Sequence, residues 1–396
     1  MDIKAASRLT KESVTGIVDL VEAVHYNITR LGGIFGNNKK QRTSGITGFV
    51  YNNVRSITAL SGEGIELLVD TLKFVENERV PSPKKKTVIS IINGVIGDYL
   101  VEKKNPLAIP MQLRYNGEQI TRVDQIQEEA RKKIVLLVHG SCMSDLQWTR
   151  KGHDHGSMLS QDFGHTPVYL LYNSGRHISD NGKELSEILE GLMRTFQANT
   201  ELVILAHSMG GLLSRSAIHY GTSLNKKWVK LVKKLIFLGT PHHGAPLEKG
   251  GNWIDNMLDS NPFSAPLSRL GKIRSAGITD LRYGNILDED WNGHDRFIPK
   301  GDQRTHVPLP TNVQCFAIAA SVGMASTKLE NELVGDGLVP ISSALGQHKN
   351  PHLNLSFAPK NQWTGSKMNH LDLLSHPEVY AKIKSWVNMN DSSELD

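Results

Sequence analysis

The chain has 396 residues, 39% of them apolar, with 45 lysines and arginines against 40 aspartates and glutamates. This length allows one large domain plus an accessory segment of about 100 residues. The apolar fraction excludes a disordered chain. Because the basic residues form short clusters without interleaved aromatic residues, nucleic acid is not favoured as a partner. We interpret these clusters as solvated surface, with attraction to an anionic membrane surface as the alternative.

Cysteine usage and the N-terminal sequence bear on the compartment. Two cysteines, Cys142 and Cys315, argue against a disulfide scaffold and fit a reducing environment. The opening residues MDIKAASRLTKESV lack the apolar core and the cleavage site of a secretory signal. No uncharged apolar run approaches the roughly 18 residues of a membrane-spanning helix. The sequence therefore predicts a cytoplasmic protein, either soluble or peripherally bound to a membrane.

Residues 1–83 are predicted to form an N-terminal helical segment. Apolar residues recur there at helix spacing, as in the run that begins with Val14, Ile17 and Val18. We expect these amphipathic helices to pack on a neighbouring core; self-association and contact with a membrane surface are the two alternatives. Prolines and lysines at 81–86 predict a linker into a second domain, 84–396.

Two Asn-Gly pairs follow this linker. Asn93-Gly94 and Asn116-Gly117 each lie between apolar runs, a pattern typical of β-hairpin turns. Residues 87–133 are accordingly expected to supply antiparallel strands that lead into the main sheet.

From residue 134 the pattern changes to strands alternating with helices. The apolar runs are short and continuous, as in strands covered on both faces, and they span 134–138, 167–172, 202–206, 234–240 and 313–320. Helices are predicted at 182–196, 211–220 and 377–387, and a final strand near 353–357. Such alternation predicts an α/β fold with a mostly parallel sheet flanked by helices.

The segment 245–310 interrupts this alternation. It is rich in glycine, proline, asparagine and aspartate, and it is too long for an ordinary connection. We interpret it as a cap or lid insertion over a pocket. Its large apolar residues are Trp253, Met257, Leu258, Phe263 and Trp291, and the first four favour an acyl chain as the ligand.

A serine on a tight strand-to-helix turn is the sharpest feature of the sequence. The apolar run ELVILA continues into His207-Ser208-Met209-Gly210-Gly211 and then into an amphipathic helix. A nucleophile on such a turn projects its hydroxyl from the sheet, and the residues two before and two after it must be small. Here these are Ala206 and Gly210, so Ser208 is predicted to be the nucleophile.

A nucleophilic serine needs a base, and the base needs an acid to orient it. Asp336 lies between two glycines in an apolar loop after the 313–320 strand, and we predict it as the acid. His370 lies between the final strand and the final helix and is the predicted base. Asp372 is an alternative acid.

Acyl transfer also needs two hydrogen-bond donors for the oxyanion. One is expected to be the backbone amide of Met209, next after the nucleophile. The other is expected from the His139-Gly140 loop after the 134–138 strand, where Ser141 is the predicted donor and Cys142 the alternative.

Two histidine pairs lie outside the predicted catalytic residues. His242 and His243 follow a strand in the motif GTPHHGAP, and we interpret them as structural, with substrate or metal contact as the alternative. His153 and His155 lack the spaced partner pair of a metal site. No metal is predicted at either place.

Together these motifs, in this order, resemble the lipase/esterase branch of the α/β-hydrolases over roughly residues 134–390. The motifs are similar to those of GPI inositol-deacylase-like proteins and bacterial triacylglycerol lipases. The resemblance implies an α/β-hydrolase fold with Ser208, Asp336 and His370 as catalytic residues, Ser141 and Met209 as the oxyanion hole, and no cofactor. Many such lipases bind a structural calcium through an aspartate at the position of Asp372, but a second aspartate is missing from 313–324.

The sequence therefore predicts a serine-dependent carboxylic ester hydrolase, lipase- or esterase-like, that acts on a lipid or medium-chain acyl ester through an acyl-enzyme at Ser208. An acyltransferase that uses the same residues is one alternative. A non-catalytic module that binds a lipid or a partner is the other.

Overall fold

The computed structural model describes residues 83–126, 129–193, 199–245, 275–294, 302–323 and 335–389. Its contacts divide the chain into two units, one of residues 1–91 and 247–274 and one of residues 92–246 and 275–396. Most of the N-terminal helical segment expected at 1–83 thus lies outside the described residues. The sheet and the predicted site residues belong to the second unit.

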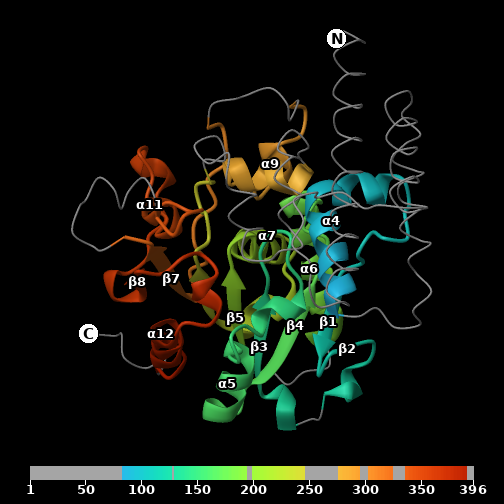
Figure 1. The fold of residues 1–396 in the computed structure, drawn as a ribbon, viewed down its shortest axis with the longest axis vertical. Helices are drawn as coiled ribbons and strands as arrows, with labels where there is room; N and C mark the ends of the chain where they lie inside the picture. Colours follow the sequence, from blue (N-terminus) through green and yellow to red (C-terminus); the bar gives the residue numbers. More distant parts are fainter. Residues whose placement is uncertain are drawn as a thin grey trace, which may run out of the picture. The chain divides into compact units, whose positions relative to one another are not determined.

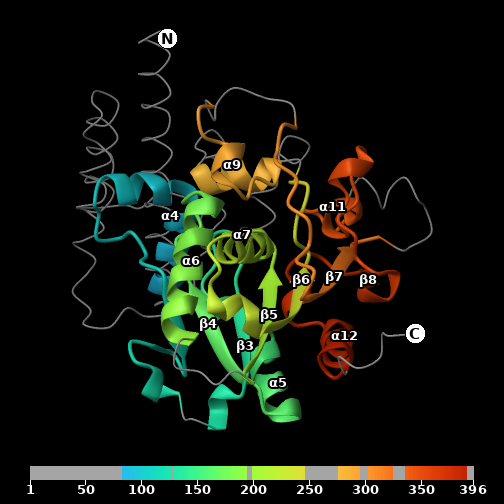
Figure 2. The same ribbon diagram turned by 180° about the vertical axis from the view of Figure 1, so that it is seen from behind.

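A single mixed sheet forms the centre of this second unit (Figures 1 and 2). In the described part of the chain it has eight strands in the order β2-β1-β4-β3-β5-β6-β7-β8. All neighbouring pairs from β4 to β8 are parallel, and β1 runs antiparallel to both of its neighbours, β4 and β2. The strands are β1 (Gln112–Tyr115), β2 (Glu118–Gln119), β3 (Lys133–Val138), β4 (Thr166–Leu171), β5 (Glu201–His207), β6 (Val232–Leu238), β7 (Gln314–Ser321) and β8 (Gln362–Ser366).

Helices cover both faces of the sheet. One core cluster joins alternate residues of β3, such as Leu136, to side chains of α6 (Ile178–Met193) and α7 (Met209–Ser223). The other joins the remaining β3 residues, such as Leu137, to α5 (His155–Phe163) and α12 (Pro377–Val387). Strands buried on both sides need apolar side chains at every position, which is why the sequence shows continuous apolar runs there.

The hairpin expected at Asn93-Gly94 is wrong, because these residues lie inside helix α4 (Pro83–Glu102), which has a kink at Ile96. The buried Asn93 side chain bonds the backbone at residues 107 and 109, with its amide donating to Leu107 (2.8 Å) and its oxygen accepting from Ile109 (2.9 Å). Gly94 lets the Cys142 loop approach, since a Cβ there would lie 2.3 Å from Cys142 Sγ. Residues 83–86, expected as a linker, are the first turn of α4, where a proline is tolerated.

The second Asn-Gly pair does form a turn. Asn116 and Gly117 both have positive φ, of 49° and 79°, and join β1 to β2. Such a two-residue turn requires two residues that adopt the left-handed region, which asparagine and glycine do most readily.

The final strand was expected near 353–357 but is β8, at 362–366. Residues 351–353 form a short 3-10 helix, and Leu355 and Phe357 are buried in the first core cluster from irregular backbone. β8 is an edge strand with mostly half-exposed residues, so it lacks the apolar run that marks the others.

The predicted cap, 245–310, is described at 275–294 and 302–310. It contains α9 (Ala276–Tyr283) and a 3-10 turn at Asp288–Asp290. Four of its apolar residues, Trp253, Met257, Leu258 and Phe263, lie outside the described residues. Within the described ranges, no helix is both long enough and apolar enough to span a bilayer.

Candidate active site

Ser208 lies between the end of β5 and the start of α7, as the sequence predicts. Its backbone has φ 55° and ψ −125°, a conformation that side-chain-bearing residues rarely adopt. Its amide donates to Leu238 O at 2.9 Å, which ties the turn to β6. At Gly210 a Cβ would lie 2.4 Å from Val138 O, so the turn requires glycine there. The strain and close packing are those of a nucleophile turn.

Asp336 and His370 form a buried pair. His370 Nδ1 lies 2.6 Å from Asp336 Oδ2, and both residues are only 2% exposed. The other carboxylate oxygen accepts from the amides of Leu338 (3.0 Å) and Val339 (2.8 Å). The amide of His370 also donates to the carbonyl of Asp336, at 3.1 Å. The carboxylate is therefore fixed from both sides, and it fixes the imidazole in turn.

The free nitrogen of His370 is buried and has no hydrogen-bond partner in the described ranges. A carboxylate at Nδ1 favours the tautomer with the proton on that nitrogen, which leaves Nε2 as an unpaired acceptor. This nitrogen is therefore free to accept a hydrogen bond from a donor placed beside it.

His207 connects the serine to this pair. It directly precedes Ser208, and its ring centroid lies 4.6 Å from that of His370, whose carbonyl its Nε2 contacts at 3.1 Å. From the β6 side, a Cβ on Gly239 would lie 3.1 Å from the His370 ring. Burial and the neighbouring His370 hold the pKa of His207 well below its usual range. His207 therefore stays neutral and adds no positive charge that would oppose protonation of His370.

The loop after β3 lies against the serine turn, since a Cβ on Gly140 would be 3.0 Å from Ser208 Cβ. The amide of Cys142, the alternative oxyanion donor, is occupied by Ser174 Oγ at 2.9 Å. The geometry therefore favours the amide of Ser141 as the second donor. Burial raises the pKa of the Cys142 thiol to about 11, so this residue stays protonated and uncharged.

Tyr172, at the end of β4, holds this loop in place. Its ring stacks on His139 at 4.3 Å and its hydroxyl donates to His139 O at 3.0 Å. Burial lowers the pKa of His139 to about 4 and keeps it neutral. Tyr172, Ser174 and His207 are not among the predicted site residues. The signal for them is their position at the ends of β4 and β5, where parallel strands present residues to a site.

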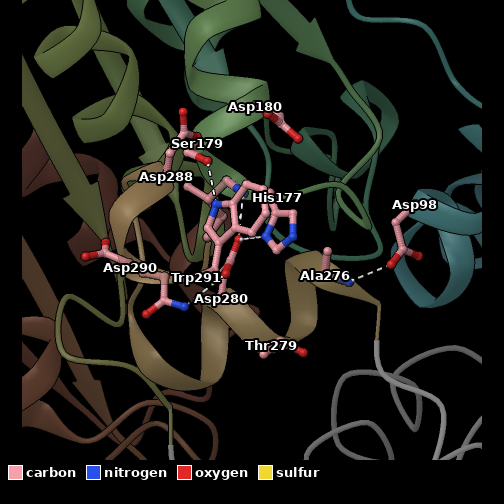
Figure 3. A network of polar contacts seen from close by, with 12 residues as sticks. Asp98, His177, Ser179, Asp180, Ala276, Thr279, Asp280, Asp288, Asp290 and Trp291 are labelled. Carbon is pink, nitrogen blue, oxygen red and sulfur yellow. Dashed lines mark hydrogen bonds and ion pairs between the residues drawn. The ribbon is translucent and has the colours of Figure 1, made fainter. Parts of the chain in front are cut away.

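The described cap residues are anchored by a polar network (Figure 3). Asp280 of α9 is buried and accepts from His177 Nδ1 and from the amide of Ile178, each at 2.9 Å. Burial raises the pKa of this carboxyl. Trp291 stacks on the His177 ring at 3.6 Å and donates to Ser179 Oγ at 2.9 Å. Trp291, expected to be an apolar cap residue, therefore docks the cap onto the start of α6.

Asp372 is not part of the buried pair. It accepts from Lys151 Nζ at 3.0 Å and from the amide of Asn369 at 3.1 Å. Over the described residues, no group of three or more histidine, cysteine, aspartate or glutamate side chains is arranged to hold a metal ion.

Residues 129–313 match the model of the PGAP1-like alpha/beta domain family. A search of curated proteins found no match. Among solved structures, the mature lipase BlEst2 of Bacillus licheniformis is 16% identical, with a TM-score of 0.43 and coverage of 71% of this chain and 98% of the lipase. Lipase B of Aspergillus fumigatus is 12% identical, with a TM-score of 0.39 and coverage of 68% and 54%.

The family match and the mostly parallel sheet flanked by helices together show an α/β-hydrolase fold. The match also confirms the resemblance that the sequence motifs predict.

Proposed function

We propose that this PGAP1-like alpha/beta domain hydrolyses carboxylic esters through an acyl-enzyme at Ser208. The observation that carries the proposal is the His370 imidazole, anchored by Asp336 at 2.6 Å and left with a buried, unpaired Nε2 beside the strained serine turn. A serine, a neutral imidazole and a fixed carboxylate are the parts that nucleophilic acyl transfer requires.

In the proposed first step, His370 Nε2 takes the proton of the Ser208 hydroxyl as its oxygen bonds to the ester carbonyl carbon. The carbonyl oxygen gains negative charge and is held by the amides of Met209 and Ser141. The tetrahedral species collapses, the bond to the alcohol oxygen breaks, and His370 gives its proton to the leaving alcohol.

In the second step, His370 takes a proton from water, and the hydroxide attacks the acyl group on Ser208. The serine leaves with the proton, and the carboxylic acid is released. Asp336 holds the Nδ1 proton in place and stabilises the imidazolium in both steps. The neutral His207 adds no opposing charge.

The proposed substrate is a lipid or medium-chain acyl ester. The large apolar residues Trp253, Met257 and Phe263 within 245–310 support it, and so does the anchoring of the described cap helix α9 at the start of α6. Acyl-chain preference is therefore the property that tests the substrate class.

The test is hydrolysis of p-nitrophenyl esters from acetate to decanoate by the wild type, Ser208→Ala and a matched control, Ser223→Ala. Ser223 lies at the exposed end of the same helix and donates to His219 O. We expect Ser208→Ala to lose activity by roughly 10⁴-fold or more and the control to keep it. Full activity in Ser208→Ala would contradict the mechanism. A sharp preference for acetate would contradict the substrate class alone.

A further inference from the structure

A cavity of about 430 Å³ lies along the later half of α7 and the segment that leads into β7. None of the proposed catalytic residues lines it. Its volume falls within the roughly 300–1,000 Å³ of small-ligand sites. Its lining contains no aspartate or glutamate and includes four basic side chains, Arg215, His219, Lys226 and Lys230.

Arg215 is the most unusual of these residues, because it is buried without a carboxylate. It is 6% exposed and forms no ion pair within the described residues. One terminal nitrogen donates to Val307 O at 2.6 Å, and the other lies 3.5 Å from His242 Nδ1. Its Nε is buried and has no hydrogen-bond partner among the described residues. A buried guanidinium without a counter-charge is costly, so a bound anion would stabilise it.

The charged groups nearest Arg215 are Arg304, which opposes its positive charge, and Asp290, a carboxylate that other groups hold. Burial and the nearby Arg304 lower the pKa of Arg215 to about 10. Asp302 pairs with Arg304 at 2.7 Å. Asp290 accepts from the amides of residues 286, 287 and 305. Both nearby carboxylates therefore already have partners.

The mouth and the wall of the cavity differ in character. Lys226 pairs with Glu187 at 2.6 Å, whereas Lys230 is exposed and has no ion pair in the described ranges. The wall is largely apolar, formed by Ile218, Val229, Val307, Leu309 and Val313. The lining thus offers positive charge beside an apolar surface.

We propose that this cavity binds an anionic amphiphile, a carboxylate or phosphate group on an apolar chain. The anionic group pairs with the Arg215 guanidinium and with Lys230, which both line the cavity, and the chain packs on the apolar wall. Guanidinium nitrogens form strong, charge-assisted bonds with both kinds of anion, which explains why either head group would be accepted. The site does not depend on catalysis at Ser208.

The test measures binding to the full chain by isothermal titration. The chain carries Ser208→Ala, so that binding is measured without turnover. The probes are decanoate, decyl phosphate, decanol and inorganic phosphate, all below their aggregation limits. The variants are Arg215→Gln, Lys230→Glu and the matched control Lys227→Glu, an exposed residue of the same turn that does not line the cavity. Since Arg215→Gln also weakens the bond to Val307, a thermal melt accompanies it, and Lys230→Glu leaves that bond intact.

We expect at least one of decanoate and decyl phosphate to bind, and decanol and inorganic phosphate to bind at least tenfold more weakly. Arg215→Gln should weaken binding about tenfold or more, and Lys230→Glu about threefold, with Lys227→Glu unchanged. No binding of either amphiphile, equal binding of decanol, or equal losses in Lys230→Glu and Lys227→Glu would overturn the proposal. Equal binding of inorganic phosphate would overturn its apolar half and leave a site for free anions.

Discussion

The substitution Asp336→Asn separates the chemistry of the site from its architecture. The carboxylate accepts three hydrogen bonds, two from the amides of Leu338 and Val339 and one from His370. An asparagine oxygen can still accept the two amide bonds, so the loop should keep its conformation. Its amino group then faces His370 Nδ1, and an N–H cannot donate to a protonated ring nitrogen. The imidazole must hold its proton on Nε2, where it cannot act as a base.

The expected loss in kcat is about 10⁴-fold, the size seen for a wrong tautomer in serine hydrolases. This corresponds to about 5 kcal/mol of transition-state stabilisation. The assay is hydrolysis of the preferred p-nitrophenyl ester, with a thermal melt to show that the fold is kept.

The matched control is Asp372→Asn, which removes the alternative acid. Its bond to Lys151 joins a largely exposed lysine, so activity should change by no more than about threefold. A loss below tenfold in Asp336→Asn, or a larger loss in Asp372→Asn, would refute the assignment of the acid.

Three further predictions concern stability. Gly210→Ala places a Cβ 2.4 Å from a backbone oxygen and should lower the free energy of unfolding by several kcal/mol. Gly191→Ala, with no described atom within 4 Å of the new Cβ, should raise it by about 0.5–1 kcal/mol, and equal melting temperatures of the two variants would contradict this. Burial lowers the pKa of His155 from 6.5 to about 4, so the unfolded chain binds the proton first and the free energy of unfolding falls as the pH drops through this window, by ~2 kcal/mol at pH 5. In urea unfolding, His155→Gln should show a weaker dependence of the free energy of unfolding on pH, and an unchanged dependence would count against this prediction. His177→Ala removes one of the hydrogen-bond partners of the buried Asp280 and should lower the free energy of unfolding by about 1.5–3 kcal/mol in urea, and no change would mean that the cap anchor adds nothing.

Much of the fold follows from the sequence because buried parallel strands need continuous apolar runs. β3 to β7 each carry such a run, and the serine turn shows itself through its small neighbours at 206 and 210. The order of serine, aspartate and histidine along the chain then indicates which residues meet. The buried contact between Asp336 and His370 is the expected result of that order.

The remaining features depend on tertiary contacts that local patterns do not record. Asn93-Gly94 reads as a turn, yet Asn93 bonds the 107–109 backbone and Gly94 makes room for Cys142. β8 lacks an apolar run because it is a half-exposed edge strand. The role of His207 depends on the ring of His370, which is 163 residues away along the chain.

The central claim, that Ser208 is an activated nucleophile, is tested most directly by labelling the full chain with a fluorophosphonate and measuring intact and peptide masses. A serine activated by His370 should take up one adduct, on the peptide that contains Ser208, and Ser208→Ala should take up none while Ser223→Ala labels as the wild type does. An adduct on Ser208→Ala, or a wild-type adduct on another residue, would contradict the account.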